Sequence, residues 1–284
     1  MHGIFMMACA GFTIAVLWAV LRHASEFMHP LYMVFWRSLF GAMVLIPWIL
    51  RQGKGVLKTD RMPLLFVRSI TGFIAMVGIF YSVAHIPLAQ AMAINYSGPL
   101  FASLGAVLIF GELMKARRVA ALIVGFLGVL VVLRPGVDDF SLGTAAALLG
   151  ALGMASSMLA IRALGTTESN QAIVIYGNML ALPFAAVLAV MYWQWPSWYE
   201  FGLLVVIGAL STVAQLFMNR ALIVAETGAI IPIDFLRLVF VSVLGAVLFG
   251  QSIDAFMWLG GIVILASVVY ITRREAKAGG EVGP

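Results

Sequence analysis

The stretch INYSGPLFASLGAVLIFG, residues 94–111, returns near the other end of the chain as IDFLRLVFVSVLGAVLFG, residues 233–250. In this register Ile94 matches Ile233, Phe101 matches Phe240, Ser103 matches Ser242, Phe110-Gly111 matches Phe249-Gly250, and Arg134 matches Arg273. A shift one residue longer lays Gly3 on Gly143 and Arg22 on Arg162. The identities are few, but matched glycines and arginines at the ends of apolar runs indicate that the chain contains two copies of one unit.

Each copy consists mainly of apolar runs long enough to cross a membrane. Of the 284 residues, 63% are hydrophobic and 10% are charged, whereas a soluble domain is roughly half apolar and a quarter charged. A membrane-spanning helix takes about 20 mostly apolar residues, and runs that are continuous rather than alternating favour helices over strands. We expect an all-α integral membrane protein with ten transmembrane helices, at residues 3–21, 31–50, 63–84, 87–110, 117–134, 141–161, 171–192, 200–222, 227–249 and 255–272.

Only His85-Ile86-Pro87 separates the third run from the fourth. Proline disfavours helical geometry at the residue before it, so we expect a turn there instead of one long helix. Each copy then holds five helices, and because five is odd the second copy crosses the membrane in the opposite sense. Such inverted repeats are typical of secondary transporters. The expected units are two five-helix repeats, residues 1–136 and 141–274, followed by a disordered cytoplasmic tail at residues 275–284.

The basic residues indicate which side of the membrane each connection occupies. With the N-terminus inside, the cytoplasmic connections hold eleven bases, whereas the opposite side holds Arg22 and Arg134. The eleven are Arg51, Lys54, Lys58, Arg61, Lys115, Arg117, Arg118, Arg162, Arg273, Arg274 and Lys277. This asymmetry predicts a multi-pass protein of the cytoplasmic (inner) membrane with both termini in the cytoplasm. The base-free aromatic segment at residues 192–199 then faces outward as an interfacial belt.

The sequence offers little for catalysis. The net charge of +5 is spread over short connections instead of one face, so it does not indicate nucleic-acid binding. Paired carboxylates for a metal, an activated nucleophile and a phosphate-binding Gly-x4-Gly-Lys-Ser/Thr loop are all absent, and Asp138-Asp139 reads as a solvated connection. We therefore expect no enzymatic activity, no catalytic residues, no metal and no cofactor.

Ionisable residues inside membrane spans are costly and are functional candidates for that reason. Five fall within the expected spans: Arg37, Arg68, Arg220, Asp234 and Arg237. Arg68 and Arg220 lie close to cytoplasmic ends, which favours snorkelling to lipid headgroups. Arg37 lies about two turns into its helix, where it either faces a cavity or satisfies carbonyls at a helix crossing.

Asp234 and Arg237 are spaced i, i+3, so they share a helix face. They could simply neutralise each other. The repeat, however, lays Asn95 on Asp234 and Gly98 on Arg237, which places two polar groups at similar depth. We therefore expect Asn95, Asp234 and Arg237 to contribute to a substrate-binding site near the midplane, with Arg37 as a further candidate.

Helix breakers accompany both polar positions. Pro99 follows Asn95, and Pro232 precedes Asp234. A proline removes one backbone hydrogen bond and frees a carbonyl, so it can bend a helix over a cavity and offer a polar backbone group to a ligand. We expect Pro99 and Pro232 to mark gating kinks. His85 is either a gate or proton site or an ordinary interfacial histidine.

Five aromatic residues fall within spans instead of at their ends, where a lipid belt would place them. A buried hydroxyl or indole N–H needs a hydrogen-bond partner, which a wet cavity supplies. As a set they suggest a cavity for amphiphilic solutes, although any one of them could be ordinary packing: Trp18, Trp36, Tyr81, Tyr96 and Tyr176.

The order of several short motifs resembles the EamA-type transporters of the drug/metabolite transporter superfamily over essentially the whole chain. These motifs are Pro99-Leu100-Phe101, Gly111-Glu112, Arg117-Arg118, Gly125 through Gly128, and Arg134-Pro135-Gly136. The resemblance implies ten helices, both termini inside, a central cavity between the halves, gating by the fourth and ninth helices, and alternating access. The second half reads Gly250-Gln251 where many members repeat Gly-Glu.

We therefore expect a secondary transporter, with export of amino acids or related metabolites as the leading hypothesis. Uptake of a nucleoside-like or vitamin-like compound is the main alternative, and a channel or scaffold is a separate class. The expected partners are a small-molecule substrate and the lipid bilayer. Small residues such as Ala147, Ala151 and Ala155 recur every fourth position and permit close helix packing, within a monomer or in a weak homodimer.

Overall fold

A computed structural model describes residues 2–52, 59, 61–111, 116–133, 140–165, 167–168, 170–224, 236–252 and 255–280, and every regular element in these ranges is an α-helix. The first half holds α1 (His2–Ala24), α2 (Pro30–Gln52), α3 (Met62–His85), α4 (Leu88–Asn95), α5 (Gly98–Phe110) and α6 (Ala116–Leu133). The second half holds α7 (Leu142–Leu164), α8 (Asn170–Met191), α9 (Trp198–Val224), α11 (Leu236–Phe249) and α12 (Ala255–Gly280).

With α4 and α5 counted as one interrupted span, the described helices make ten, as expected from the sequence. Four of them are long and apolar enough to cross a membrane by length and composition alone: Phe5–Ala24, Met62–His85, Leu88–Phe110 and Leu142–Leu164. The boundary between α3 and α4 falls at Ile86-Pro87, where a turn was predicted. Helix α12 continues to Gly280, so it includes residues 275–280 of the segment assigned to a disordered tail.

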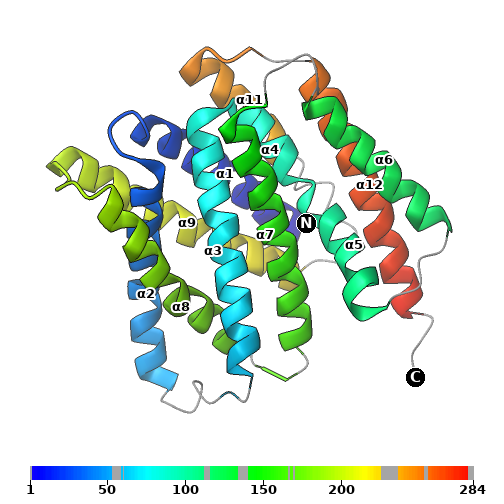
Figure 1. The fold of residues 1–284 in the computed structure, drawn as a ribbon, viewed down its shortest axis with the longest axis horizontal. Helices are drawn as coiled ribbons and strands as arrows, with labels where there is room; N and C mark the ends of the chain where they lie inside the picture. The colour runs from blue at the N-terminus through cyan, green and yellow to red at the C-terminus, as the bar shows by residue number, and fades with distance from the viewer. Residues whose placement is uncertain are drawn as a thin grey trace.

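The packing of the helices repeats between the halves (Figure 1). Helix α1 packs against α9 and α11, and its counterpart α7 packs against α3 and α5. Helix α2 contacts α9, just as α8 contacts α3, while the equivalent helices α2 and α8, and likewise α6 and α12, pair directly. Each contact within this set maps onto another when the halves are exchanged, which is the pattern of an inverted repeat.

Two glycines show the repeat at the level of backbone geometry. Gly111 ends α5 with φ of 66°, and Gly250 ends α11 with φ of 61°. The Gly111 N–H donates to the Val107 carbonyl at 3.0 Å, and the Gly250 N–H donates to the Ala246 carbonyl at 3.1 Å. A left-handed residue satisfies a free carbonyl at a helix end and favours glycine. Equivalent positions thus end equivalent helices by the same hydrogen bond.

The span formed by α4 and α5 is interrupted at Tyr96-Ser97. The Ser97 hydroxyl and the Ser97 backbone N–H both donate to the Ile94 carbonyl, at 2.6 Å and 2.9 Å. Pro99 occupies the first turn of α5, where its missing N–H costs no hydrogen bond. The start of α4 has an unusual partner, because the Leu88 N–H donates to the Gln251 side chain of the other repeat at 2.9 Å.

Helices α3 and α7 approach each other closely at their glycines. A Cβ placed on Gly78 would overlap the Ala146 carbonyl and would lie 2.6 Å from the Gly150 backbone. A Cβ on Gly153 would lie 2.7 Å from the Ala75 nitrogen. Small residues permit this approach in membranes, where packing instead of the hydrophobic effect holds helices together. The small residues of α7 therefore pack within one chain.

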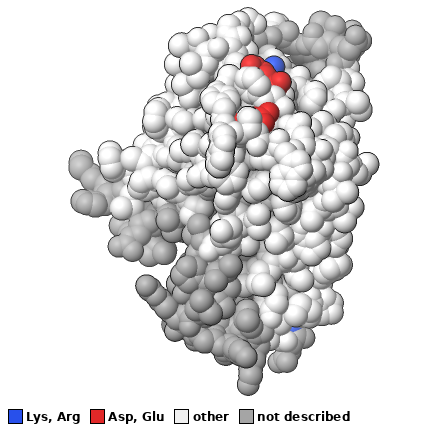
Figure 2. All heavy atoms as spheres, turned by 90° about the vertical axis from the view of Figure 1, so that its left-hand side faces the viewer, with Lys and Arg blue, Asp and Glu red and all other residues white. Residues whose placement is uncertain are grey.

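The surface of the helices is suited to lipid. Large apolar side chains such as Leu108, Leu127, Val187 and Val247 are exposed on its sides. Figure 2 shows one such side almost free of charge, with most of the acidic and basic atoms gathered near one end. Among the most exposed aromatic side chains are Trp195 and Trp198, in and beside the connection between α8 and α9, which is the segment predicted to form an interfacial belt.

The close contact between α3 and α7 gives a stability test. Gly78→Ala places a methyl group against backbone atoms that cannot move without separating the helices, so we expect a loss of about 1–3 kcal/mol in unfolding free energy. The matched control is Gly202→Ala in α9, where an added Cβ meets nothing within 4 Å. Denaturation in detergent micelles would measure both variants, and equal midpoints would contradict the packing described.

Candidate functional site

A cavity of about 340 Å³ lies between the two repeats. Its walls come from α1, α2, α3 and α4 of the first half and from α7, α8, α9 and α11 of the second. Much of the wall is apolar, with Ile14, Leu17, Trp18, Phe73, Ile79, Phe80 and Met154 among its residues. The charged side chains among its described lining residues are Arg37, Arg68 and Arg237, and Asn95, Asn178, Ser38 and Ser211 add uncharged polar groups.

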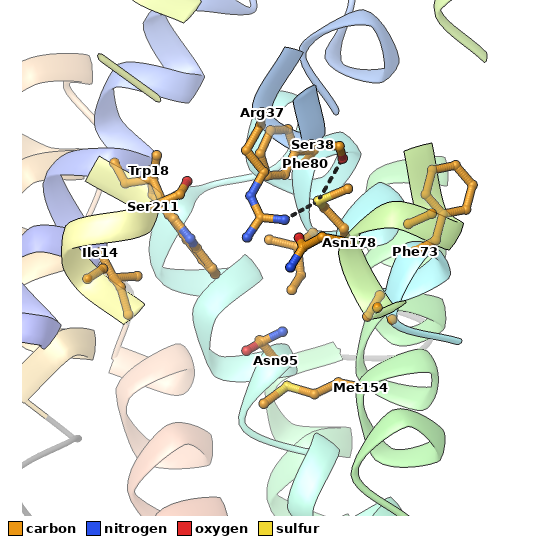
Figure 3. Close-up of a pocket in the computed structure, with 18 of the residues that line it drawn as sticks. Ile14, Trp18, Arg37, Ser38, Phe73, Phe80, Asn95, Met154, Asn178 and Ser211 are labelled. Carbon is orange, nitrogen blue, oxygen red and sulfur yellow. Dashed lines mark hydrogen bonds between the residues drawn. The ribbon is translucent and has the colours of Figure 1, made fainter. Parts of the chain in front are cut away.

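Arg37 extends from α2 into this cavity (Figure 3). Its Nη1 contacts the Met76 sulfur of α3, and a thioether is a weak acceptor. The neighbouring Ser38 hydroxyl donates to the Val34 carbonyl of its own helix at 2.8 Å. Among the described residues, the guanidinium group, which carries five N–H donors, has this one weak acceptor. Of the two roles left open by the sequence, Arg37 takes the one that faces the cavity.

Arg68 reaches the cavity from α3 and lies against α8. An added Cβ on Gly177 would overlap the Arg68 guanidinium group, so the missing side chain at Gly177 provides the space that this group occupies. The Arg68 Nε is buried and has no hydrogen-bond partner among the described residues. This differs from the snorkelling expected for Arg68. The side chain of Arg220, for which the same was expected, lies outside the described residues.

Asn95 lies at the last turn of α4, where the interrupted span opens. Its side chain is 8% exposed, and its Nδ2 has no hydrogen-bond partner in the described part of the chain. Asn178 of α8 lines the same cavity, and both amides border the space that Arg37 enters (Figure 3). A buried amide without a partner is costly. The cavity therefore contains a donor that a solute or water can satisfy.

Arg237 lies near the start of α11, close to α1. Its Cβ would be 3.4 Å from a Cβ placed on Gly11, so Gly11 allows α11 to approach α1. Its guanidinium carbon is 5.5 Å from the centre of the Tyr96 ring, at a distance suited to a cation–π contact. Tyr96 lies at the interruption between α4 and α5 and therefore supports a cavity residue without lining the cavity itself.

The structure separates the predicted candidates into two groups. Trp18, Arg37, Asn95 and Arg237 line the cavity. Trp36 packs with Tyr32, Phe40 and Phe201, Tyr176 packs with a cluster around Leu65 and Ile173, and Tyr81 stacks on His85. Pro99 lines a second cavity of about 310 Å³ that is formed by α5, α7 and α12. Asp234 and Pro232 lie outside the described residues.

Arg68 and Asn178 line the cavity but were not among the predicted site residues. Arg68 was visible as a charge within a span, but its distance from the helix end does not reveal the direction in which its side chain points. Asn178 is a polar residue near the middle of an apolar run, and this was a signal that could have identified it. In the described residues, groups of three or more His, Cys, Asp or Glu side chains arranged to hold a metal are absent.

His85 belongs to a group of rings at one end of the molecule, the histidine–tyrosine cluster of His29, Tyr81, His85 and Tyr192. The rings of His29 and Tyr192 stack at 3.6 Å between centroids, and those of Tyr81 and His85 stack at 4.0 Å. Nearby, the Tyr32 hydroxyl donates to the Gln194 carbonyl at 2.9 Å. The cluster ties the start of α2, the end of α3 and the connection after α8 together.

His29 gives this end of the protein a dependence on pH. Burial, together with the nearby imidazole of His85, lowers the pKa of His29. Its Nδ1 accepts a hydrogen bond from the Leu31 N–H at 3.3 Å, which requires this nitrogen to be unprotonated. In the unfolded chain the pKa is about 6.5, so the unfolded state binds more protons between the folded pKa and about 6.5.

The stability associated with His29 should therefore be complete above pH of about 6.5 and should be lost as the pH falls through the folded pKa. His29→Asn removes the titration but keeps a side chain that caps helices well. Thermal midpoints measured from pH 7.5 to pH 5 should fall less steeply for this variant than for the parent. Parallel pH profiles would show that His29 does not contribute.

Comparison with known proteins agrees with this architecture. The EamA-like transporter family matches residues 1–134 and again residues 141–273. The pseudopaline exporter CntI of Pseudomonas aeruginosa (strain UCBPP-PA14) is 29% identical over 277 residues, which cover 96% of each chain. The riboflavin transporter of Vibrio cholerae is 29% identical over 285 residues, covering 98% of this chain and 95% of the relative.

The S-adenosylmethionine uptake transporter of Rickettsia felis is 27% identical over 257 residues, which cover 90% of this chain and 87% of the relative. A solved structure described as "Crystal structure of protein" has a TM-score of 0.57 and 20% sequence identity, and the match covers 94% of this chain and 98% of that one. This last likeness concerns the fold alone. The two matches to one family, each over about half of the chain, show that this chain belongs to the EamA-like transporter family.

Proposed function

We propose that this protein is a secondary transporter that carries small amphiphilic metabolites across the cytoplasmic membrane by alternating access around the central cavity. Transport of a small molecule follows from membership of the family, because the relatives are named as small-molecule transporters. The observation that supports the mechanism is the cavity itself, since helices from both inverted repeats line it and it combines aromatic walls with arginine and asparagine side chains. Rocking of the halves around such a site is the usual mechanism of inverted-repeat transporters.

In this proposal both termini lie in the cytoplasm, because most bases then fall on the cytoplasmic side. The interruption between α4 and α5 provides one gate, and the proline at position 232 marks its counterpart in the second repeat. The histidine–tyrosine cluster closes the outer end. The carrier works as a monomer or as a weak homodimer.

Export of amino acids or related compounds is the direction and substrate class that we favour. A relative named as an exporter supports export, and the cavity volume supports a small solute. Uptake of a vitamin-like or nucleoside-like compound is the second candidate, supported by relatives named as transporters of riboflavin and as uptake transporters of S-adenosylmethionine.

Counterflow in proteoliposomes tests the carrier mechanism. Vesicles loaded with an unlabelled amino acid should accumulate the labelled compound transiently, with a rate that saturates as its concentration rises. Asn95→Leu should lower transport efficiency about tenfold, because it removes an amide donor from the cavity. Ser156→Ala is the control, since its exposed hydroxyl donates to the Leu152 carbonyl of its own helix. Flux that grows linearly without saturation would contradict a carrier and indicate a channel.

Asp234 can be tested separately on the basis of the sequence. In the alignment of the two repeats, Asp234 is the residue equivalent to Asn95, and we propose that it contributes to the same site. Asp234→Asn should therefore reduce transport more than Asp138→Asn, which changes a carboxylate expected in a solvated connection. The rates of both variants in the counterflow assay give the comparison, and equal, small effects would remove Asp234 from the mechanism.

A further inference from the structure

The central cavity has arginines but no carboxylates among its described lining residues. Its described lining includes three arginines, Arg37, Arg68 and Arg237, and no aspartate or glutamate. Arg37 and Arg68 are like charges that line the same space. Cations inside a membrane span are costly unless they are paired, and two like charges in one apolar cavity add to that cost. The arrangement therefore favours a solute that supplies negative charge.

Arg22 is an example of an arginine that binds backbone carbonyls of the protein. At the end of α1, its Nη1 donates to the Val83 carbonyl at 3.0 Å and to the Ile86 carbonyl at 3.2 Å. By contrast, Arg37 contacts a thioether, and the buried Nε of Arg68 has no partner among the described residues. Within the described part of the chain, the guanidinium groups of Arg37 and Arg68 therefore have N–H donors without a strong acceptor, and both residues line the cavity.

Arg37 and Arg68 meet α3 at different heights. Arg37 contacts α3 at Met76, eight residues beyond Arg68, so the Cα atoms of Met76 and Arg68 are about 12 Å apart along the axis of α3. Two separated cations are better matched by two anionic groups on one solute than by a single anionic group. Carboxylates suit them, because guanidinium binds a carboxylate through two parallel hydrogen bonds.

The volume and walls of the cavity limit the rest of the solute. About 340 Å³ equals the space of about eleven water molecules in the liquid, which suits a solute with about that many non-hydrogen atoms. Trp18, Phe73 and Phe80 provide apolar surface for its carbon skeleton, and the amides of Asn95 and Asn178 can bind further polar groups.

Gly177 determines where the charge of Arg68 lies. Any side chain at this position would collide with the guanidinium group, which is the flexible end of Arg68. Gly177→Ala should therefore retain the fold and the positive charge of Arg68, but it should move the guanidinium group away from α8. This makes Gly177 a positioning residue for solute recognition, acting through Arg68.

We propose that the solute carried by this protein is a small organic dicarboxylate whose two carboxylates bind Arg37 and Arg68, with Gly177 holding Arg68 in position. This inference rests on the proposed carrier function and specifies its substrate class. It excludes neutral amino acids and cations as preferred solutes.

The first test measures thermal stabilisation of the full-length protein in detergent at constant ionic strength. L-Glutamate is compared with L-glutamine, which has a similar shape but lacks the second carboxylate, and glutarate is compared with glutaramide, which has a similar shape but no charge. Glycerol 3-phosphate represents organic phosphates. We expect the two dicarboxylates to raise the melting temperature by about 2 °C or more, and the amides to have little effect. Equal stabilisation by the amides, stabilisation by the phosphate alone, or no stabilisation by either dicarboxylate would overturn the proposal.

The second test uses variants that separate binding from folding. Arg37→Gln and Arg68→Gln should weaken dicarboxylate binding by about ten- to a hundredfold, because each removes a charge-assisted hydrogen bond. Gly177→Ala should weaken it about tenfold while the ligand-free melting temperature stays near that of the parent. Arg61→Gln, which removes an exposed charge at the start of α3, and Gly202→Ala, which adds a methyl group in open space, should retain the parental response.

An unchanged preference for L-glutamate over L-glutamine in Arg68→Gln would overturn the proposal even if the variant is less stable. Counterflow with the same compounds distinguishes this failure from failure of the carrier function. Saturable counterflow of a neutral amino acid with none of glutamate would refute the dicarboxylate and leave the carrier intact. Stabilisation by dicarboxylates together with linear, nonsaturating flux would retain the anion site and refute the carrier.

Discussion

The structure depends on a constraint that lipid imposes on the backbone: a helix can be interrupted inside a membrane only where the freed polar groups find partners or face a polar space. The span made of α4 and α5 is interrupted at Tyr96-Ser97. At the interruption the Ser97 hydroxyl donates to the Ile94 carbonyl, and at the opposite end of α4 the other repeat contributes Gln251 as the acceptor for the Leu88 N–H. The interruption also brings Asn95 to the cavity, so the structural weak point and the polar site occur together.

The inverted repeat explains how such a site can be both stable and mobile. Tight glycine-mediated contacts between α3 and α7 fix parts of the two halves against each other, while the interrupted span crosses the same region with a broken hydrogen-bond ladder. The contact between α3 and α7 can therefore stay fixed while the span of α4 and α5 bends at its interruption. The histidine–tyrosine cluster adds aromatic contacts at one end that can open without unfolding a helix.

Much of the fold could be predicted from the sequence, because the same physical requirements recur at both copies of the repeat. Gly111 and Gly250 end equivalent helices, Pro87 marks a turn, and Pro99 lies next to the interruption between α4 and α5. At each of these positions only a few residue types fit the backbone geometry. The site was harder to predict. Depth along a helix can be counted, but the direction of a side chain cannot, so Arg68 was assigned to the lipid surface and Tyr81 and Tyr176 to the cavity. The role of Gly177 depends on a residue more than one hundred positions away, and its sequence neighbours give no sign of it.

The central claim is that the space between the two repeats is reached by water from one side of the membrane at a time. Cys9, the only cysteine of the chain, can be replaced by serine. Ser211→Cys then places a thiol in the cavity, because Ser211 lines it, and the native hydroxyl donates to the Ile207 carbonyl of its own helix. Ser156→Cys on the exposed side of α7 is the matched control. A membrane-impermeant thiol reagent should label position 211 from one side only at any moment, with labelling slowed by a transported solute, and should leave position 156 unlabelled. No labelling of position 211 from either side, or equal labelling of both positions, would contradict the account.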